Sequence, residues 1–217
     1  VKAQSADPKQ WNRLKKIFAS KSLQLVSFTI TEKGYALQKA DGSWFPFVEN
    51  DIKNGPEQVT GAMAVLVAML LERYKAGKYP LALVSMDNCS QNGAKLRESV
   101  LMMAEEWRKA GFVDTDFIDY ISDENVIAFP WTMIDKITPR PSEQIAADLE
   151  ALGVEDMQPV ITSKQTYIAP FVNAEKPQYL VIEDSFPNGR PALEKGFGVY
   201  LAEDMNADTK HQVLLPA

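Results

Sequence analysis

Apolar positions follow two different patterns along this chain. Apolar residues at helical spacing predict helices over residues 8–19, 59–76, 93–110 and 143–152. Short apolar runs predict strands over residues 23–30, 81–86 and 126–129, followed by three more runs at 159–162, 167–171 and 179–183. Alternating strands and helices are typical of a mostly parallel sheet with helices on its faces. The expected fold class is therefore α/β, with extra strands toward the C-terminus.

Polar side chains stand at or shortly after the ends of three of the predicted strands. They are Thr31 and Glu32, Asp87 and Asn88, and, a few positions beyond the third strand, Asp135. In open α/β sheets, ligands bind at the carboxyl ends of the strands. Polar residues at three such ends therefore predict a ligand site at this edge of the sheet.

The composition narrows the choice of partners. The 217 residues carry a formal net charge of -6 without a cluster of lysines and arginines, so nucleic acid is not an expected partner. No apolar run reaches the roughly 18 to 20 residues that span a bilayer, so the membrane is not expected either. With one cysteine and one histidine, the chain can form neither an internal disulfide nor a zinc site of the Cys/His type. A protein of the reducing cytoplasm fits this pattern.

Four segments resemble, in order and spacing, the polyol-specific long-chain dehydrogenase/reductase family, which includes mannitol 2-dehydrogenase, fructuronate reductase and tagaturonate reductase. These segments are Thr29–Tyr35, Val84–Asn88 with Asn92 and Gly93, Phe129–Pro139, and Val181–Phe186 with Gly189–Pro191. The resemblance implies an incomplete Rossmann-like fold. It also implies hydride transfer between NAD or NADP and a small-molecule polyol or sugar acid, without a metal.

The expected organisation has three parts. Residues 1–140 would form the second half of a Rossmann-like NAD(P)-binding domain. Residues 141–204 would be a strand-rich extension of the same domain, and residues 205–217 an irregular tail.

The resemblance also implies roles for the polar strand ends. Asn88 matches an asparagine that hydrogen-bonds the reacting oxygen, and Glu32 matches an acidic residue beside the catalytic centre. Asp135 matches an aspartate near the nicotinamide and the catalytic lysine. Thr31, Asp87 and Asn88 are the expected cofactor contacts. Independently of the family, a carboxamide N–H at a strand end can stabilise negative charge that develops on a carbonyl oxygen.

Two features of the family are missing from this sequence. No Gly-x-Gly turn for the diphosphate of the cofactor precedes Leu23, and no Lys…Asn…His helix follows Gly189–Pro191. Lys210 lies near the place of the catalytic lysine, but the residues around it differ, so the role is not transferred to it. We therefore expect the central fragment of such an enzyme, inactive alone, with a truncated sheet whose edge can pair with another copy.

Each candidate residue also has an interpretation that needs no ligand. Asp87 and Asn88 could cap the following helix or form an Asx turn, and Glu32 and Asp135 could be solvated turn residues. For the chain as a whole, the alternative is a non-catalytic folded domain with at most weak ligand binding. A hydrolase or isomerase with paired carboxylates is disfavoured, because the adjacent acids at 183–184 point to opposite faces of one strand.

Overall fold

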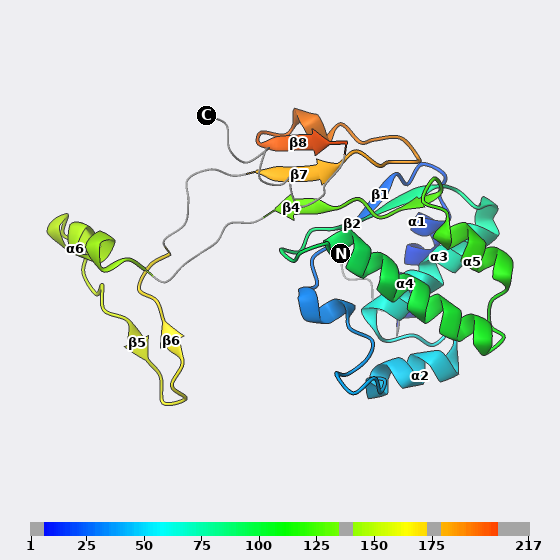
Figure 1. Cartoon of the computed structure of the whole chain (residues 1–217), viewed down its shortest axis with the longest axis horizontal. Helices are drawn as coiled ribbons and strands as arrows, with labels where there is room; N and C mark the ends of the chain where they lie inside the picture. Colours follow the sequence, from blue (N-terminus) through cyan, green and yellow to red (C-terminus); the bar gives the residue numbers. More distant parts are fainter. Residues whose placement is uncertain (1–6, 135–140, 173–178, 204–217) are drawn as a thin grey trace. The chain divides into compact units, whose positions relative to one another are not determined.

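The computed structural model describes residues 7–134, 141–172 and 179–203. The chain forms two compact units (Figure 1). The first comprises the chain up to Ile134 together with the segment from Leu180 onward, and the second comprises Asp135–Tyr179. The strands that follow Leu180 therefore belong with the first part of the chain. The domain boundaries expected at residues 140 and 204 stay predictions.

The first unit contains most of the regular structure. Its helices are α1 (Pro8–Phe18), α2 (Pro46–Asn54), α3 (Ala62–Gly77), α4 (Asn92–Lys109) and α5 (Thr115–Ser122), with the short 3-10 helices η1 (Glu32–Tyr35) and η2 (Leu193–Lys195). Its strands are β1 (Leu25–Phe28), β2 (Leu81–Ser85), β3 (Ile127–Ala128), β4 (Thr132–Ile134), β7 (Leu180–Glu183) and β8 (Val199–Ala202). The sequence pattern predicted α1, α3, α4, β1, β2, β3 and β7 within a few residues, and it missed α2, α5, β4 and β8.

Strand β2 is the centre of the parallel sheet, whose order is β1-β2-β3. Leu81 and Leu83 pack into the core with the helices, whereas Ala82 and Val84 face the opposite side, where Ile182 of β7 meets them. Figure 1 shows α3, α4 and α5 on one side of β2 and β4, β7 and β8 on the other. Because β2 is buried on both faces, its residues 81–84 are continuously apolar instead of alternating.

The extra C-terminal strands form a second, mixed sheet. Strand β7 lies between β4, to which it is antiparallel, and β8, to which it is parallel. Thr132 pairs with Ile182, so this sheet joins segments that are far apart in the sequence. The expectation of a parallel sheet with helices and additional C-terminal strands is confirmed.

A buried arginine fixes the path of the chain into the sheet. Arg73 of α3 is fully buried, and its guanidinium donates hydrogen bonds of 2.7–3.0 Å to backbone carbonyls. These carbonyls belong to Phe18, Ser20, Leu23, Tyr79 and Pro80. They precede β1 and β2, so one side chain holds the starts of two neighbouring strands. An arginine suits this position because its fork offers five N–H donors.

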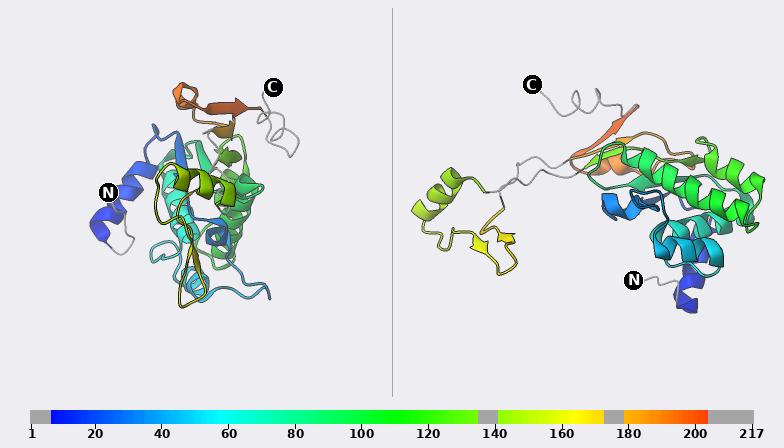
Figure 2. Two further views of the ribbon diagram at one scale, coloured as in Figure 1. Left: turned by 90° about the vertical axis from the view of Figure 1, so that its left-hand side faces the viewer. Right: turned by 60° about the horizontal axis from the view of Figure 1, so that its bottom comes forward.

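The second unit consists of α6 (Glu143–Ala151) and an antiparallel hairpin of β5 (Val160–Ile161) and β6 (Tyr167–Ile168) (Figure 2). None of the α6 side chains is buried, and all four residues of the hairpin strands are exposed. Ser142 stands at the predicted N-cap of α6, but its side chain makes no capping hydrogen bond.

Candidate functional site

The candidate site lies at the carboxyl ends of β1 and β2. These strands are parallel neighbours, with Phe28 opposite Ser85, so the residues after them emerge at the same edge of the sheet. The segment Ile30–Tyr35 follows β1, and the segment Met86–Gln91 follows β2. The polar residues expected at two strand ends therefore share one edge.

Asp87 binds the segment Ile30–Tyr35 to the end of β2. Its side chain is buried, and its carboxylate oxygens accept hydrogen bonds from the backbone amides of Ile30 (3.0 Å) and Thr31 (2.8 Å). The hydroxyl of Tyr35 donates to the same carboxylate. Both ends of the segment are thus bound to one side chain, through hydrogen bonds of the strong, charge-assisted kind.

Thr31 has a backbone conformation that is rare for a β-branched residue, with φ 65° and ψ 160°. Such a conformation costs on the order of 1–3 kcal/mol, and the bond from its amide to Asp87 offsets part of that cost. At Gly34, a Cβ would come within 3.0 Å of the Ile30 side chain. The segment is therefore a tight turn, and it leaves the Thr31 and Glu32 side chains exposed.

Tyr35 completes this network inside the protein. Its hydroxyl lies 2.6 Å from the Ser85 hydroxyl and donates to Asp87. Burial, helped by the neighbouring Asp87, raises the pKa of Tyr35 well above its ordinary value. The hydroxyl therefore stays protonated at physiological pH and acts as a hydrogen-bond donor to the carboxylate.

Asn92 makes a similar link between β2 and β4. Its buried carboxamide donates to the Thr132 hydroxyl (2.9 Å) and to the Asp87 carbonyl (3.0 Å), and it accepts from the Thr132 amide (3.1 Å). A Cβ on the next residue, Gly93, would lie 2.3 Å from the carbonyl oxygen of Phe129. Because Gly93 has no side chain, α4 can begin directly against the end of β3.

Three of the predicted site residues, Thr31, Glu32 and Asn88, are exposed. Glu32 forms an ion pair with Lys95 in the first turn of α4. The hydrogen bond and the charge of Lys95 lower the pKa of Glu32, and the hydrogen bond that Lys95 donates to Glu32 raises the pKa of Lys95. The Asn88 carboxamide has no hydrogen-bond partner among the described residues, so its donors are available to a ligand.

The capping alternative for Asp87 and Asn88 does not describe α4. The N-cap residue of α4 is Gln91, in a left-handed conformation, and its side chain makes no capping hydrogen bond. The Gly93 amide donates to the Asn92 carboxamide oxygen instead. Asp87 binds amides of the segment after β1 instead. Asp87 therefore connects two strand ends and does not start the helix.

Sequence reasoning located four of the five predicted site residues at one edge of the sheet: Thr31, Glu32, Asp87 and Asn88. Asp87 was expected to contact the cofactor, and its carboxylate is bound to backbone amides within the protein. Asp135 and Lys210 lie outside the described residues. Lys95 was missed, because a lysine on an amphipathic helix is typical of a solvated face.

No group of three or more His, Cys, Asp and Glu side chains in the described ranges could hold a metal ion. The helices of the described part of the chain are too short or too polar to cross a membrane.

Comparison with known proteins identifies the family to which this chain belongs. Residues 8–195 match the model of the mannitol dehydrogenase Rossmann domain. The chain belongs to the mannitol dehydrogenase family. This confirms the resemblance found in the sequence, and it identifies the parallel sheet with its helices as part of a Rossmann domain.

Mannitol dehydrogenase family members align with nearly all of this chain. D-mannonate oxidoreductase of Thermotoga maritima is 56% identical over 196 residues, which is 89% of this chain and 36% of that protein. Mannitol 2-dehydrogenase of Phaeosphaeria nodorum is 30% identical over 194 residues, which is 88% of this chain and 30% of that protein.

Two solved structures of polyol dehydrogenases share the fold. Substrate-free D-sorbitol dehydrogenase has a TM-score of 0.62 at 31% identity. Pseudomonas fluorescens mannitol 2-dehydrogenase, in a complex with NAD and D-mannitol, has a TM-score of 0.61 at 29% identity. Each match covers 92% of this chain and 37% of the other chain. The chain thus spans about a third of the length of these family members.

Proposed function

We propose that this chain is the part of an NAD(P)-dependent dehydrogenase that binds the nicotinamide end of the cofactor and the reacting oxygen of a polyol or sugar acid. The observation that carries the proposal is the family match over residues 8–195, together with exposed polar side chains at the carboxyl ends of β1 and β2. The names of the relatives, D-mannonate oxidoreductase and mannitol 2-dehydrogenase, support this class of substrate.

In this proposal Asn88 is the group that stabilises the reacting oxygen. Its carboxamide N–H donors hydrogen-bond the carbonyl of the ketose or the alkoxide of the polyol. A well-placed donor of this kind lowers a barrier by on the order of 2.7–4 kcal/mol. Glu32 is the acidic residue beside this oxygen, and Asp135 is assigned to orient a lysine that supplies and removes the proton.

The described residues fit one end of the cofactor. The exposed side chains of Thr31 and Asn88 offer polar contacts for the nicotinamide and its ribose, and Asp87 supports this surface through the Thr31 amide. The adjacent amides of Ile30 and Thr31 are bound to Asp87, so they are not available to the diphosphate. We therefore assign the diphosphate to residues other than these two amides. When bound, NAD or NADP accepts or donates the hydride.

We also propose that the chain can self-associate. In the described part of the chain, β1 pairs with β2 along one edge, and no strand pairs with its other edge. An open strand edge offers unpaired N–H and C=O groups to another copy.

Dinucleotide binding and turnover test the proposed function. The complete product of the gene that encodes this chain is titrated with NADH and NADPH by fluorescence, beside residues 1–217 alone. It is then assayed with D-mannonate, D-mannitol and their keto forms. We expect binding and hydride transfer by the complete gene product and weak or no binding by residues 1–217 alone. Absence of both binding and turnover in the complete gene product would refute the proposed activity.

The Asn88→Ala variant tests the role of the carboxamide. We expect kcat to fall about 10²- to 10³-fold, because the donor to the reacting oxygen is lost. The melting temperature should not change, because the exposed side chain has no hydrogen-bond partner among the described residues. Asn50→Ala, at an exposed asparagine of α2, is the matched control and should retain full activity. Equal kcat values for the two variants would show that the Asn88 carboxamide does not stabilise the reacting oxygen.

A further inference from the structure

We infer that Lys95 binds the carboxylate of the substrate, so that this site selects a sugar acid over a neutral polyol. The inference rests on the proposed function and assigns a substrate class to the same site. In the unliganded protein, Glu32 is the ion-pair partner of Lys95. We assign the substrate carboxylate to the place that Glu32 occupies in the unliganded protein.

A continuous set of contacts connects Lys95 to the proposed reacting centre. Lys95 is one helical turn after Gln91, whose carbonyl accepts its backbone amide at 3.0 Å. Its ammonium contacts Glu32, the residue after Thr31, and the Thr31 amide binds the carboxylate of Asp87, which precedes Asn88. Lys95 therefore lies at the same edge of the sheet as the polar strand ends.

The pair between Lys95 and Glu32 is open to exchange with a ligand. The two side chains are 36% and 67% exposed, and ion pairs that are this accessible contribute little to stability. A hollow of about 260 Å³ opens beside the pair, and Lys95, Glu32, Gln38 and Ser99 are among its lining residues. A carboxylate that enters from solvent can therefore replace Glu32 without disrupting packed structure.

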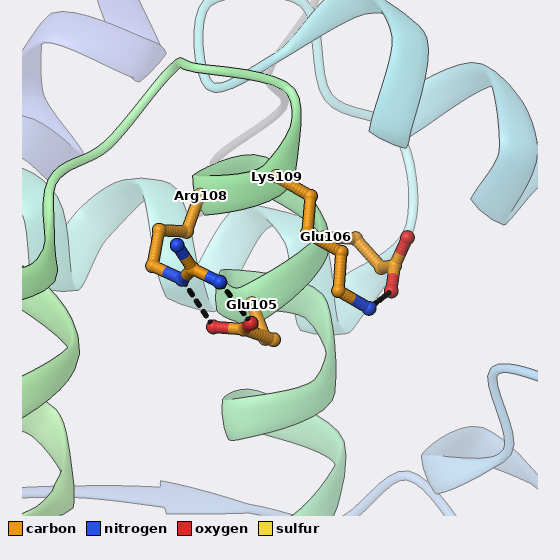
Figure 3. A network of polar contacts seen from close by, with 4 residues as sticks. All are labelled: Glu105, Glu106, Arg108 and Lys109. Carbon is orange, nitrogen blue, oxygen red and sulfur yellow. Dashed lines mark hydrogen bonds and ion pairs between the residues drawn. The ribbon is translucent and has the colours of Figure 1, made fainter.

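Two cations at the other end of α4 are arranged differently. Arg108 and Lys109, at the far end of the helix, pair with Glu105 and Glu106 on the same helix surface (Figure 3). Such pairs at i,i+3 spacing are typical of a solvated helix face. Lys95, in contrast, reaches across to a segment after another strand. Lys109 is for this reason a matched control.

The relative at 56% identity supports a charged substrate. Its name, D-mannonate oxidoreductase, describes a protein that acts on a sugar acid, which carries a carboxylate at neutral pH. Proteins bind carboxylates by charge-assisted hydrogen bonds from lysine or arginine. Lys95 is such a donor at the edge of the sheet where the substrate is proposed to bind.

Substrate binding at Lys95 has a consequence for Glu32. In the unliganded protein, Lys95 lowers the pKa of Glu32 by a hydrogen bond and by its charge. When the substrate carboxylate takes Lys95 as its partner, this lowering of the Glu32 pKa is lost and the Glu32 carboxylate is released from the ion pair. A sugar acid would thus free the Glu32 carboxylate beside its own reacting oxygen.

The test compares Lys95→Met with Lys109→Met in the complete gene product, with D-mannonate and D-mannitol as substrates. We expect Lys95→Met to raise the KM for D-mannonate about 10- to 100-fold, because a hydrogen bond between charged groups is lost. The KM for D-mannitol and the affinity for NADH should stay unchanged. Lys95→Arg should restore most of the D-mannonate affinity, and Lys109→Met should behave like the wild type.

Direct binding of D-mannonate by calorimetry separates this inference from the proposed function. If the wild type binds D-mannonate and Lys95→Met does not, Lys95 is a carboxylate-binding residue. If turnover is absent in the same experiment, the proposed dehydrogenase activity is refuted but the binding role of Lys95 stands. If Lys95→Met binds D-mannonate as the wild type does, or loses both substrates equally, the inference is overturned while the dehydrogenase function stands. A wild type that does not bind D-mannonate overturns it as well.

Discussion

Two buried polar side chains, Asp87 and Asn92, position the segments that carry the candidate site. Each connects the end of β2 to a neighbouring segment: Asp87 binds the amides of Ile30 and Thr31, and Asn92 binds Thr132. Buried polar groups are costly unless they are hydrogen-bonded, and here the bonds hold three strand ends in fixed positions. The exposed residues next to them can therefore approach a ligand from a rigid base.

Gly93→Ala tests the close approach of α4 to the strand ends. Helix propensity alone predicts that alanine stabilises this position by roughly 0.5–1 kcal/mol. The structure predicts the opposite sign, because a Cβ would lie 2.3 Å from the Phe129 carbonyl oxygen. We expect a loss of about 1–3 kcal/mol in the free energy of unfolding, as in overpacked cores. Urea denaturation measures the sign, and a stabilised variant would contradict the packing described here.

Elements with a continuous apolar run, or with apolar residues at helical spacing, could be predicted from the sequence. Short elements could not. Strand β2 was predicted because residues 81–84 are all apolar, and α4 because its apolar residues recur at helical spacing. Strand β4 has three residues, too few for a period, and it forms because β7, far along the chain, pairs with it. Helix α5 has eight residues, so its apolar face covers little more than two turns.

Candidate site residues could be predicted where they follow a strand that the sequence pattern reveals. Asn88, Glu32 and Thr31 follow recognisable strands, so their position at one edge could be inferred. Lys95 and Arg73 could not be assigned a role, because a charged residue within a helix pattern usually faces solvent. Their functions depend on tertiary partners, which are Glu32 for Lys95 and backbone carbonyls for Arg73.

Asp87→Asn tests whether the segment Ile30–Tyr35 is held by one carboxylate. The variant keeps the size of the side chain but loses the charge and one acceptor. We expect the amides of Ile30 and Thr31 to exchange hydrogen about 10- to 150-fold faster, because each hydrogen bond to a charged group is worth about 1.5–3 kcal/mol. Hydrogen–deuterium exchange read by NMR gives the rates residue by residue.

Asp114→Asn is the matched control for this experiment. Asp114 also binds a backbone amide, that of Phe117 at the start of α5. Its substitution should speed exchange at the start of α5 and leave Ile30–Tyr35 unchanged. Equal acceleration across the molecule in Asp87→Asn would show a general loss of stability, and no acceleration would show that the carboxylate does not hold the turn.

Among the strands that the structure describes, β1 has a partner on one edge only, because it is the first strand in the order β1-β2-β3. Backbone carbonyls of Gln24 and Phe28 accept amides of the β2 segment, so alternate residues of β1 bond inward. The intervening residues, Leu25 and Ser27, direct their N–H and C=O groups outward. The relatives are about three times as long as this chain.

Ser27→Pro tests whether this edge mediates self-association of residues 1–217. We expect light scattering to give a mass for the wild-type chain that rises with concentration toward a dimer, because an unpaired edge is a template for another strand. Proline removes an outward N–H and no inward bond, and edge strands tolerate it for that reason. The variant should stay monomeric with an unchanged circular dichroism spectrum. Ser27→Thr keeps the N–H and should associate as the wild type does. If both variants associate equally, or the wild type is a monomer at all concentrations, β1 does not provide the contact.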